Sequence, residues 1–157
     1  IDPKHYGYYS AVGPAAYIVG TIINQVGVGK HGIIRMLKLG LFAMTLGSGA
    51  LFTVVYLNAN LVAICTTFSL YGIGMALVFA NSAAKAVDVA PRYRGTASSI
   101  LSTIEMSFAA LSCYLISLVS TDDLCPSTFT MLICSFVSIY LFCTTNKAER
   151  HQVKSAV

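Results

Sequence analysis

Charged side chains are scarce in this sequence of 157 residues. Asp, Glu, Lys and Arg make up 10% of the chain, whereas they make up roughly 25% of an ordinary soluble domain. Hydrophobic residues make up 56% of the chain, and the mean hydropathy is +0.73. A soluble domain of this composition would leave large apolar areas in contact with water. The composition therefore excludes an ordinary soluble domain and indicates a membrane protein.

Paired cysteines of the C-x-x-C type are also absent. The chain has five cysteines, and four of them lie inside apolar stretches, where cysteine behaves as a small packing residue. We therefore expect no metal site and no cofactor. The net charge of +4 does not indicate nucleic-acid binding, because no basic face carries interleaved aromatic residues for base stacking.

Five apolar stretches of about 20 residues dominate what remains. A helix of ~20 residues crosses the apolar core of a bilayer, so the sequence predicts an all-α integral membrane protein with the lipid bilayer around it. The predicted spans are residues 9–28, 36–57, 61–84, 96–119 and 128–145.

The basic residues fall on alternate loops. Nine of the ten lie on one side of the predicted membrane, and Lys4 lies on the other; the nine are Lys30, Arg35, Lys38, Lys85, Arg92, Arg94, Lys147, Arg150 and Lys154. The positive-inside rule assigns that side to the cytoplasm. It predicts an outside N-terminus and a cytoplasmic tail, residues 146–157. Since an outside N-terminus follows naturally from an odd number of earlier spans, we expect the chain to be the C-terminal part of a larger protein.

The fourth stretch carries a face of small and polar residues. Its members follow one another at spacings of four, three, four and three, which places them on one side of a helix; they are Ser98, Ser102, Glu105, Ala109 and Ser112. Glu105 lies about ten residues into the stretch, or ~15 Å along a helix. The sequence therefore places a carboxyl group near the bilayer midplane.

An acidic side chain at that depth needs an explanation. A charged carboxylate at the bilayer centre costs ~2.5 kcal/mol or more, so Glu105 is expected to be protonated, paired or exposed to an aqueous cavity. A carboxyl that binds and releases protons suits proton coupling, and it can also pair with a cationic substrate. The alternative is a structural role, in which a protonated Glu105 bonds to a neighbouring helix.

Other polar groups are weaker candidates. Tyr71 and Asn81 of the third stretch are predicted to contact a substrate, whereas Asn24 and Gln25 of the first are interpreted as interfacial caps. The second stretch, rich in Leu and Gly, is expected at the periphery. The loop cations Lys30, Arg35, Arg92 and Arg94 are expected to set the topology and to form gating contacts on the cytoplasmic side.

Enzyme motifs are not supported. Each of the three histidines lies in a loop or tail and no predicted span contains aspartate, which excludes the base that an intramembrane serine or aspartyl protease needs. The segment 27–32 resembles a phosphate-binding loop, but Asn24 stands where that motif requires Gly and His31 where it requires Ser or Thr. We therefore expect a protein that is not an enzyme.

Two segments resemble a known transporter family. The run Phe79–Ala84, followed by Arg92–Ser99 with its Gly-Thr-Ala-Ser sequence, resembles the region of helices ten and eleven in drug–proton antiporters of the Bcr/CflA type. These antiporters belong to the major facilitator superfamily. The segment Gly29–Gly32 with Arg35 resembles the basic loop between helices eight and nine. The resemblance covers nearly the whole chain.

The resemblance implies that the five spans are helices eight to twelve of a twelve-helix fold. They would form most of the C-terminal six-helix bundle, without its first helix and without the N-terminal half. Alternating access around a central cavity is implied, with the first, third and fourth spans approaching it. Ala80 departs from the family, where proline is frequent. The resemblance also implies that the main proton-carrying acid lies in the N-terminal half, which would make Glu105 a secondary or substrate-facing group.

The functional prediction is a fragment of a proton-coupled exporter of drugs or small metabolites in a bacterial inner membrane. Its expected partners are protons, a small-molecule substrate and the missing N-terminal half. Two alternatives stay open: an uptake carrier or uniporter of the same fold, and a membrane scaffold that does not transport.

Overall fold

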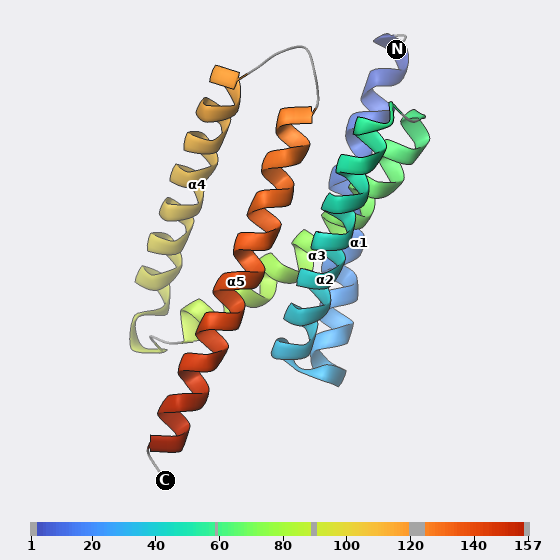
Figure 1. Cartoon of the computed structure of the whole chain (residues 1–157). Helices are drawn as coiled ribbons and strands as arrows, with labels where there is room; N and C mark the ends of the chain where they lie inside the picture. The colour runs from blue at the N-terminus through green and yellow to red at the C-terminus, as the bar shows by residue number, and fades with distance from the viewer. Residues whose placement is uncertain (1–2, 59, 89–90, 120–124, 156–157) are drawn as a thin grey trace.

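The computed structural model describes residues 3–58, 60–88, 91–119 and 125–155, and their side chains at 11–58, 60–88, 91–118 and 125–145. Within these ranges the chain forms five α-helices and one short 3-10 helix, with no strand (Figure 1). The helices are α1 (Pro3–His31), α2 (Ile33–Tyr56), α3 (Leu61–Asp88), α4 (Arg94–Val119) and α5 (Cys125–Ser155), and η1 (Pro91–Tyr93) precedes α4. Asp122 and Asp123, and the side chains of Lys4, Lys147, Arg150 and Lys154, lie outside the described parts.

Each of the five helices is long and apolar enough to cross a membrane. The mean hydropathy of the five candidate spans runs from 1.3 to 2.0. The shortest helix, α2, has 24 residues and is ~36 Å long, which exceeds the ~30 Å apolar core of a bilayer. The predicted all-α membrane architecture with five spanning helices is confirmed, and the chain is a multi-pass membrane protein.

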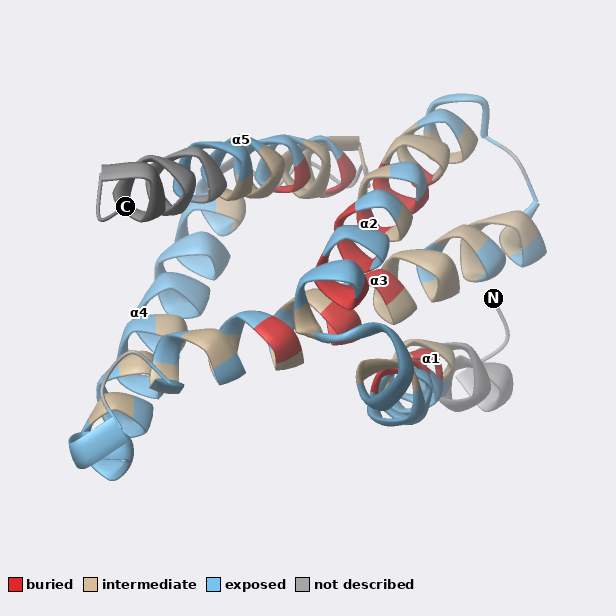
Figure 2. Cartoon of the chain, turned by 90° about the horizontal axis from the view of Figure 1, so that it is seen from below, coloured by how far each residue is buried: buried red, intermediate tan, exposed pale blue. Residues whose placement is uncertain are grey.

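Four helices pack together, and the fifth, α4, stands apart. The largest contact is between α2 and α3, α1 lies against α3, and α5 lies against α2. Figure 2 shows most of the buried residues near the crossing of α2 and α3, whereas the described residues of α4 are exposed or half-buried. None of the α4 window that could span a membrane is buried. The described core is therefore the packing of α1, α2, α3 and α5.

Glycines allow the backbones of α2 and α3 to approach closely. A Cβ atom on Gly47 would lie 2.6 Å from the backbone nitrogen of Tyr71, and one on Gly40 would lie 2.7 Å from the Cβ of Leu77. Gly74 in α3 meets the backbone of Met44 in the same way. Small residues at helix contacts are typical of membrane bundles, where close van der Waals packing replaces the hydrophobic effect.

Small residues also bring α1 close to α3. Ala16 is buried, and a Cβ on Gly20 would lie 2.8 Å from the Cβ of Ala76 in α3. Pro14 lies inside α1, which continues to His31 without interruption. The region that resembled a phosphate loop is therefore helical up to residue 31 and offers no loop to surround a phosphate.

The prediction that the second span is peripheral is wrong for one of its faces. α2 has more buried residues than any other described helix, and they recur at helical spacing; they are Met36, Leu37, Gly40, Leu41, Met44, Gly47, Ser48 and Leu51. Composition alone did not reveal this face, because its large and small residues are all apolar or weakly polar. The opposite face, with Leu39, Phe42 and Leu46, is exposed and is suited to lipid.

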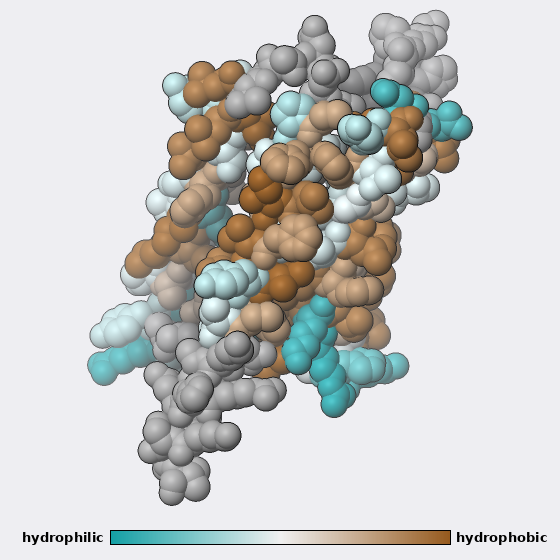
Figure 3. Space-filling model, in the orientation of Figure 1, coloured by the Kyte–Doolittle hydropathy of each residue, from teal (hydrophilic) through white to brown (hydrophobic). Residues whose placement is uncertain are grey.

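The turns that carry basic residues meet at one end of the molecule. The α1–α2 turn, the short helix η1 with the start of α4, and the C-terminal end of α5 all lie at the lower end in Figure 1. Figure 3 shows apolar side chains over the middle of the visible face and hydrophilic ones toward its ends. We call the lower end the basic end; its described basic residues are Lys30, His31, Arg35, Lys38, Lys85, Arg92 and Arg94.

Gly32 alone joins α1 to α2, with a φ of 80° that favours glycine.

Candidate functional site

Glu105 lies near the middle of α4. The residue follows the helix start at Arg94 by eleven positions, or ~17 Å, in a helix of 26 residues that is ~39 Å long. It is half-buried, as are Ala97, Leu101 and Ile116 on the same side of the helix. α4 contacts both α3 and α5, so this side is turned toward the rest of the bundle. The structure therefore places the carboxyl at mid-helix, beside the bundle and incompletely covered by it.

No described residue pairs with Glu105. Its carboxylate makes neither a hydrogen bond nor an ion pair within the described part of the chain. Of the cations at the start of α4, Arg94 pairs with Asp88 across 3.3 Å. The Glu105 carboxyl is thus available to a proton, to a cationic ligand or to another helix.

The predicted serine neighbours of Glu105 are exposed. Ser98, Ser102 and Ser112 are exposed, and within the described residues none of the three has a hydrogen bond. Three other hydroxyl residues of α4 donate to carbonyl oxygens of their own helix: Ser99 to Gly95 and Thr96, Thr103 to Ser99, and Ser107 to Thr103. The serines on the Glu105 face therefore retain their hydrogen-bonding capacity.

Tyr71 packs against apolar side chains of α2. It is half-buried in α3 and lies against the cluster of Leu37, Leu41 and Met44 from α2. Its ring also stacks on that of Phe68, with the centroids 6.5 Å apart. These contacts give Tyr71 a role in the α2–α3 interface, and they make it a weaker ligand-binding candidate than Glu105.

Asn81 makes a buried hydrogen bond between two helices. Its side-chain amide donates to Asn24 Oδ1 in α1 across 2.6 Å and to the backbone oxygen of Leu77 across 2.7 Å. Asn81 is 2% exposed and Asn24 is 8% exposed. The interpretation of Asn24 as an interfacial cap is therefore wrong: it is the interhelical partner of Asn81. Gln25, the other residue of that interpretation, is exposed.

An adjacent cavity makes this asparagine pair partly accessible to a ligand. The cavity has a volume of about 420 Å³ and lies between α1, the start of α2 and α3. Thr21, Gln25 and both asparagines supply its polar lining. Asn81, predicted from the sequence as a weaker candidate, thus lies beside a cavity with several hydrogen-bonding groups.

Removing the asparagine pair is expected to affect stability asymmetrically. Asn81→Ala leaves the buried Asn24 amide unpaired, which costs ~1–3 kcal/mol, whereas Asn24→Ala leaves Asn81 still bonded to Leu77. We expect Asn81→Ala to lower the free energy of unfolding in mixed micelles more than Asn24→Ala does. The double-mutant coupling should be ~0.6–1.7 kcal/mol. Gln25→Ala is the control, and a coupling near zero would contradict an energetically significant pair.

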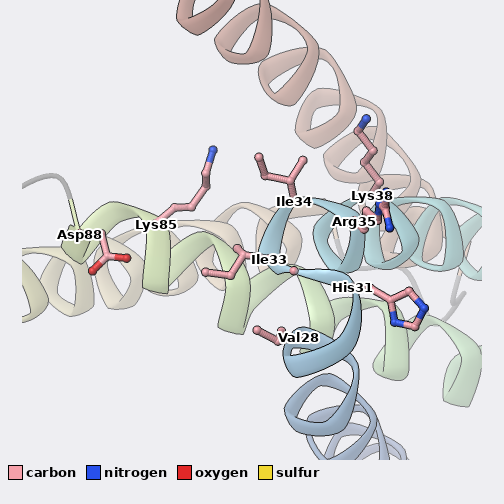
Figure 4. Close-up of a pocket in the computed structure, with 9 residues that line it drawn as sticks. Val28, His31, Ile33, Ile34, Arg35, Lys38, Lys85 and Asp88 are labelled. Carbon is pink, nitrogen blue, oxygen red and sulfur yellow. The ribbon is translucent and has the colours of Figure 1, made fainter.

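A second cavity lies at the basic end. It has a volume of about 1080 Å³ and is lined by residues of α1, α2, α3 and the α1–α2 turn (Figure 4); its charged and titratable lining residues are His31, Arg35, Lys38, Lys85 and Asp88. Of the four loop cations that we expected to form gating contacts, Arg35 lines this cavity, and Arg94 pairs with Asp88, the only acidic residue among the described lining residues. Lys30 and Arg92 are exposed outside it.

Sequence reasoning missed three residues of these sites. Asn24 was assigned to a cap, and Lys38 and Lys85 were treated only as topological charges. The available signal for Asn24 was an amide within an apolar stretch, because such a group needs a partner when it is away from water. No signal within the sequence identifies that partner, which is 57 residues away.

Comparison with known proteins gives one informative similarity. The chain is 23% identical over 151 residues to the bicyclomycin resistance protein homolog of Haemophilus influenzae. The match covers 95% of this chain and 38% of the relative, so the chain spans well under half of the relative's length. No family model matches the chain, and no solved structure matches it. The similarity and the five spanning helices together support a membrane transporter in general.

Proposed function

We propose that the chain is part of a proton-coupled exporter of drugs or small metabolites. The proposal assigns it to the major facilitator superfamily, as most of the C-terminal bundle of a drug–proton antiporter of the Bcr/CflA type. The observation that carries the proposal is the carboxyl of Glu105, which has no partner among the described residues and lies near the middle of an apolar helix that is long enough to cross a membrane. An acid at that depth is a functional candidate by default, since membrane-embedded carboxyls are costly.

The Glu105 face would form part of the transport pathway. Ser98, Ser102 and Ser112 lie along the same side of α4 with hydroxyls that have no described partner. In this proposal they donate hydrogen bonds to substrate or water while Glu105 exchanges a proton or pairs with a cationic substrate. Asn81 contributes from the neighbouring cavity between α1 and α3.

A missing N-terminal half would complete the cavity. α4 is exposed along its length and contacts α3 and α5 only over small areas. The proposed helices outside this chain would cover that surface and alternate access around it, as two bundles that move against each other. The match covers 38% of a longer relative, so that relative has length for further helices beyond the matched part.

The basic end is assigned to the cytoplasm of a bacterial cell. The bias of positive charge toward this end supports a cytoplasmic C-terminus. Lys30, Arg35, Arg92 and Arg94 would then lie at the cytoplasmic mouth. The ion pair between Arg94 and Asp88 joins the start of α4 to the end of α3, which is where a gating contact between helices would act.

Transport by the intact protein in proteoliposomes tests the proposal. Bicyclomycin is the first substrate to try because the relative is named for resistance to it, and a fluorescent cationic dye is the second. We expect an imposed pH gradient to drive substrate movement in the direction opposite to the protons, and an uncoupler to abolish this movement.

Other outcomes favour the alternatives. Movement that is insensitive to the pH gradient would indicate a uniporter, and movement in the same direction as protons would indicate an uptake carrier. If several substrate classes show no movement while Glu105→Gln and Ser102→Leu are both without effect on growth in the presence of drugs, the proposal of an exporter is wrong and a scaffold is favoured.

A further inference from the structure

Two cavities adjoin at Lys85. The basic-end cavity of about 1080 Å³ has Lys85 in its lining. A second cavity of about 340 Å³ also has Lys85 in its lining and lies between α2, α3 and α5. Its walls are mainly apolar and include Leu37, Leu41, Val78 and Phe142. The basic-end cavity, whose described lining includes several charged residues, and this crevice therefore share one cationic side chain.

The described lining of the basic-end cavity has more cationic than acidic residues. Arg35 and Lys38 of α2 line it, and within the described residues neither has a hydrogen bond or an ion pair. Asp88, the only acidic residue among the described lining residues, is already paired with Arg94. Figure 4 shows Arg35 and Lys38 on one side of Ile34 and Lys85 on the other. The basic-end cavity is thus suited to a compact anion.

The surroundings of these cations are suited to acyl chains. Arg35, Leu39, Phe42 and Leu46 recur at helical spacing on α2, and the three apolar members are 54%, 68% and 50% exposed. From Arg35 to Leu46 the helix rises ~17 Å, close to half of the ~30 Å apolar core. A headgroup at Arg35 and Lys38 would leave one acyl chain beside this stripe and the other beside the crevice, which lies toward the opposite face of α2.

We infer that the basic end holds an anionic phospholipid, with its phosphate between Arg35, Lys38 and Lys85 and an acyl chain in the crevice of α2, α3 and α5. The occupant is a lipid because cations and apolar surface adjoin, at the ends of spanning helices where headgroups lie. Basic pockets between membrane helices recognise such headgroups. The inference is independent of substrate and of the direction of transport.

Native mass spectrometry of the intact protein in detergent tests the site. The probes are dioleoyl phosphatidylglycerol, which is anionic, and dioleoyl phosphatidylcholine, which is zwitterionic. We expect tighter binding of phosphatidylglycerol. Arg35→Gln with Lys38→Gln should weaken that binding about 30-fold, which corresponds to two contacts of ~1 kcal/mol each. Both residues are exposed, so the fold should persist, as circular dichroism would verify.

Lys30→Gln with Arg92→Gln is the matched control. It removes the same charge from the same end of the molecule, at exposed residues outside the cavity lining, and should weaken binding less than about threefold, as a change in surface potential does. Equal losses in the two double variants would overturn the site. Equal binding of the two lipids would overturn the preference for anions.

Two further experiments distinguish a bound lipid from a bound free anion. Millimolar inorganic phosphate should not displace phosphatidylglycerol, and displacement would show a phosphate site in place of a lipid site. Val78→Phe fills the crevice without removing a cation and should weaken lipid binding. If it does not fold, Leu141→Phe at the exposed rim of the same crevice is the substitute. Unchanged binding in the folded variant would overturn the acyl-chain position.

Discussion

Glu105→Gln in the intact protein is expected to reduce proton-driven efflux at least about tenfold while expression stays unchanged. Glutamine keeps the size of the side chain but cannot bind and release a proton. Loss of a charge-assisted contact worth ~1.5 kcal/mol corresponds to that factor. The described structure offers Glu105 no partner, so the substitution breaks no described contact within the bundle. Initial efflux rates in proteoliposomes with an imposed pH gradient measure the effect.

The choice of substrate separates the two proposed roles of Glu105. If Glu105 carries a proton, efflux of cationic and neutral substrates should fall together in the glutamine variant. If it pairs with a cationic substrate, efflux of a neutral substrate should persist. Glu105→Asp retains a titratable group, set back by one methylene, and should recover part of the rate in either case.

Thr103→Val is the matched control for Glu105→Gln. Thr103 lies two positions away on the same helix, is exposed, and donates its hydroxyl to the backbone of Ser99 across 2.8 Å. Valine has a similar shape, so this variant removes a hydroxyl group on a side of α4 away from Glu105. We expect it to transport normally. Normal efflux from Glu105→Gln with every substrate would remove Glu105 from the mechanism.

Gly47→Ala is expected to lower the free energy of unfolding by ~1–3 kcal/mol, the usual cost of overpacking. The added Cβ would lie 2.6 Å from the backbone nitrogen of Tyr71 and 2.8 Å from its Cα. Backbone atoms cannot rotate away as a side chain does, so α2 and α3 would have to separate. Unfolding in mixed micelles, followed by circular dichroism, measures the change.

Gly49→Ala, two positions along the same helix, is expected to be neutral or stabilising. The nearest atom to a Cβ at this position is Leu132 Cδ1, at 3.9 Å, an ordinary contact. Alanine also favours a helix over glycine by up to ~1 kcal/mol. The two variants should therefore differ in sign or by several kcal/mol. Equal stabilities would show that the close crossing of α2 and α3 does not contribute to the fold.

Local patterns in the sequence accounted for the spans and for the polar face of the fourth helix. Apolar length is a property of consecutive residues, so five membrane-spanning helices could be read directly. The 3.6-residue period likewise places Ser102 and Glu105 on one side of a helix from their spacing alone. These predictions needed no knowledge of which helices are neighbours.

Contacts between helices could not be predicted in the same way. The partner of Asn24 depends on how α1 lies against α3, and no spacing within α1 encodes it. The same holds for Gly47 and Tyr71, where a glycine in an apolar stretch gives no indication of which backbone it meets. Lys38 and Lys85 approach one cavity only because α2 and α3 both have an end at the basic end. Each of these features depends on packing between segments far apart in the sequence.

The glycine crossing of α2 and α3 has a mechanical consequence. Side chains at a helix contact can change rotamer and let two helices slide, but Gly40, Gly47 and Gly74 have none to change. We therefore expect α2 and α3 to move as one rigid lever. α4 touches its neighbours sparingly and follows a short exposed 3-10 helix, Pro91–Tyr93. Bending during a working cycle should then concentrate at that connection, with the carboxyl of Glu105 on the moving arm.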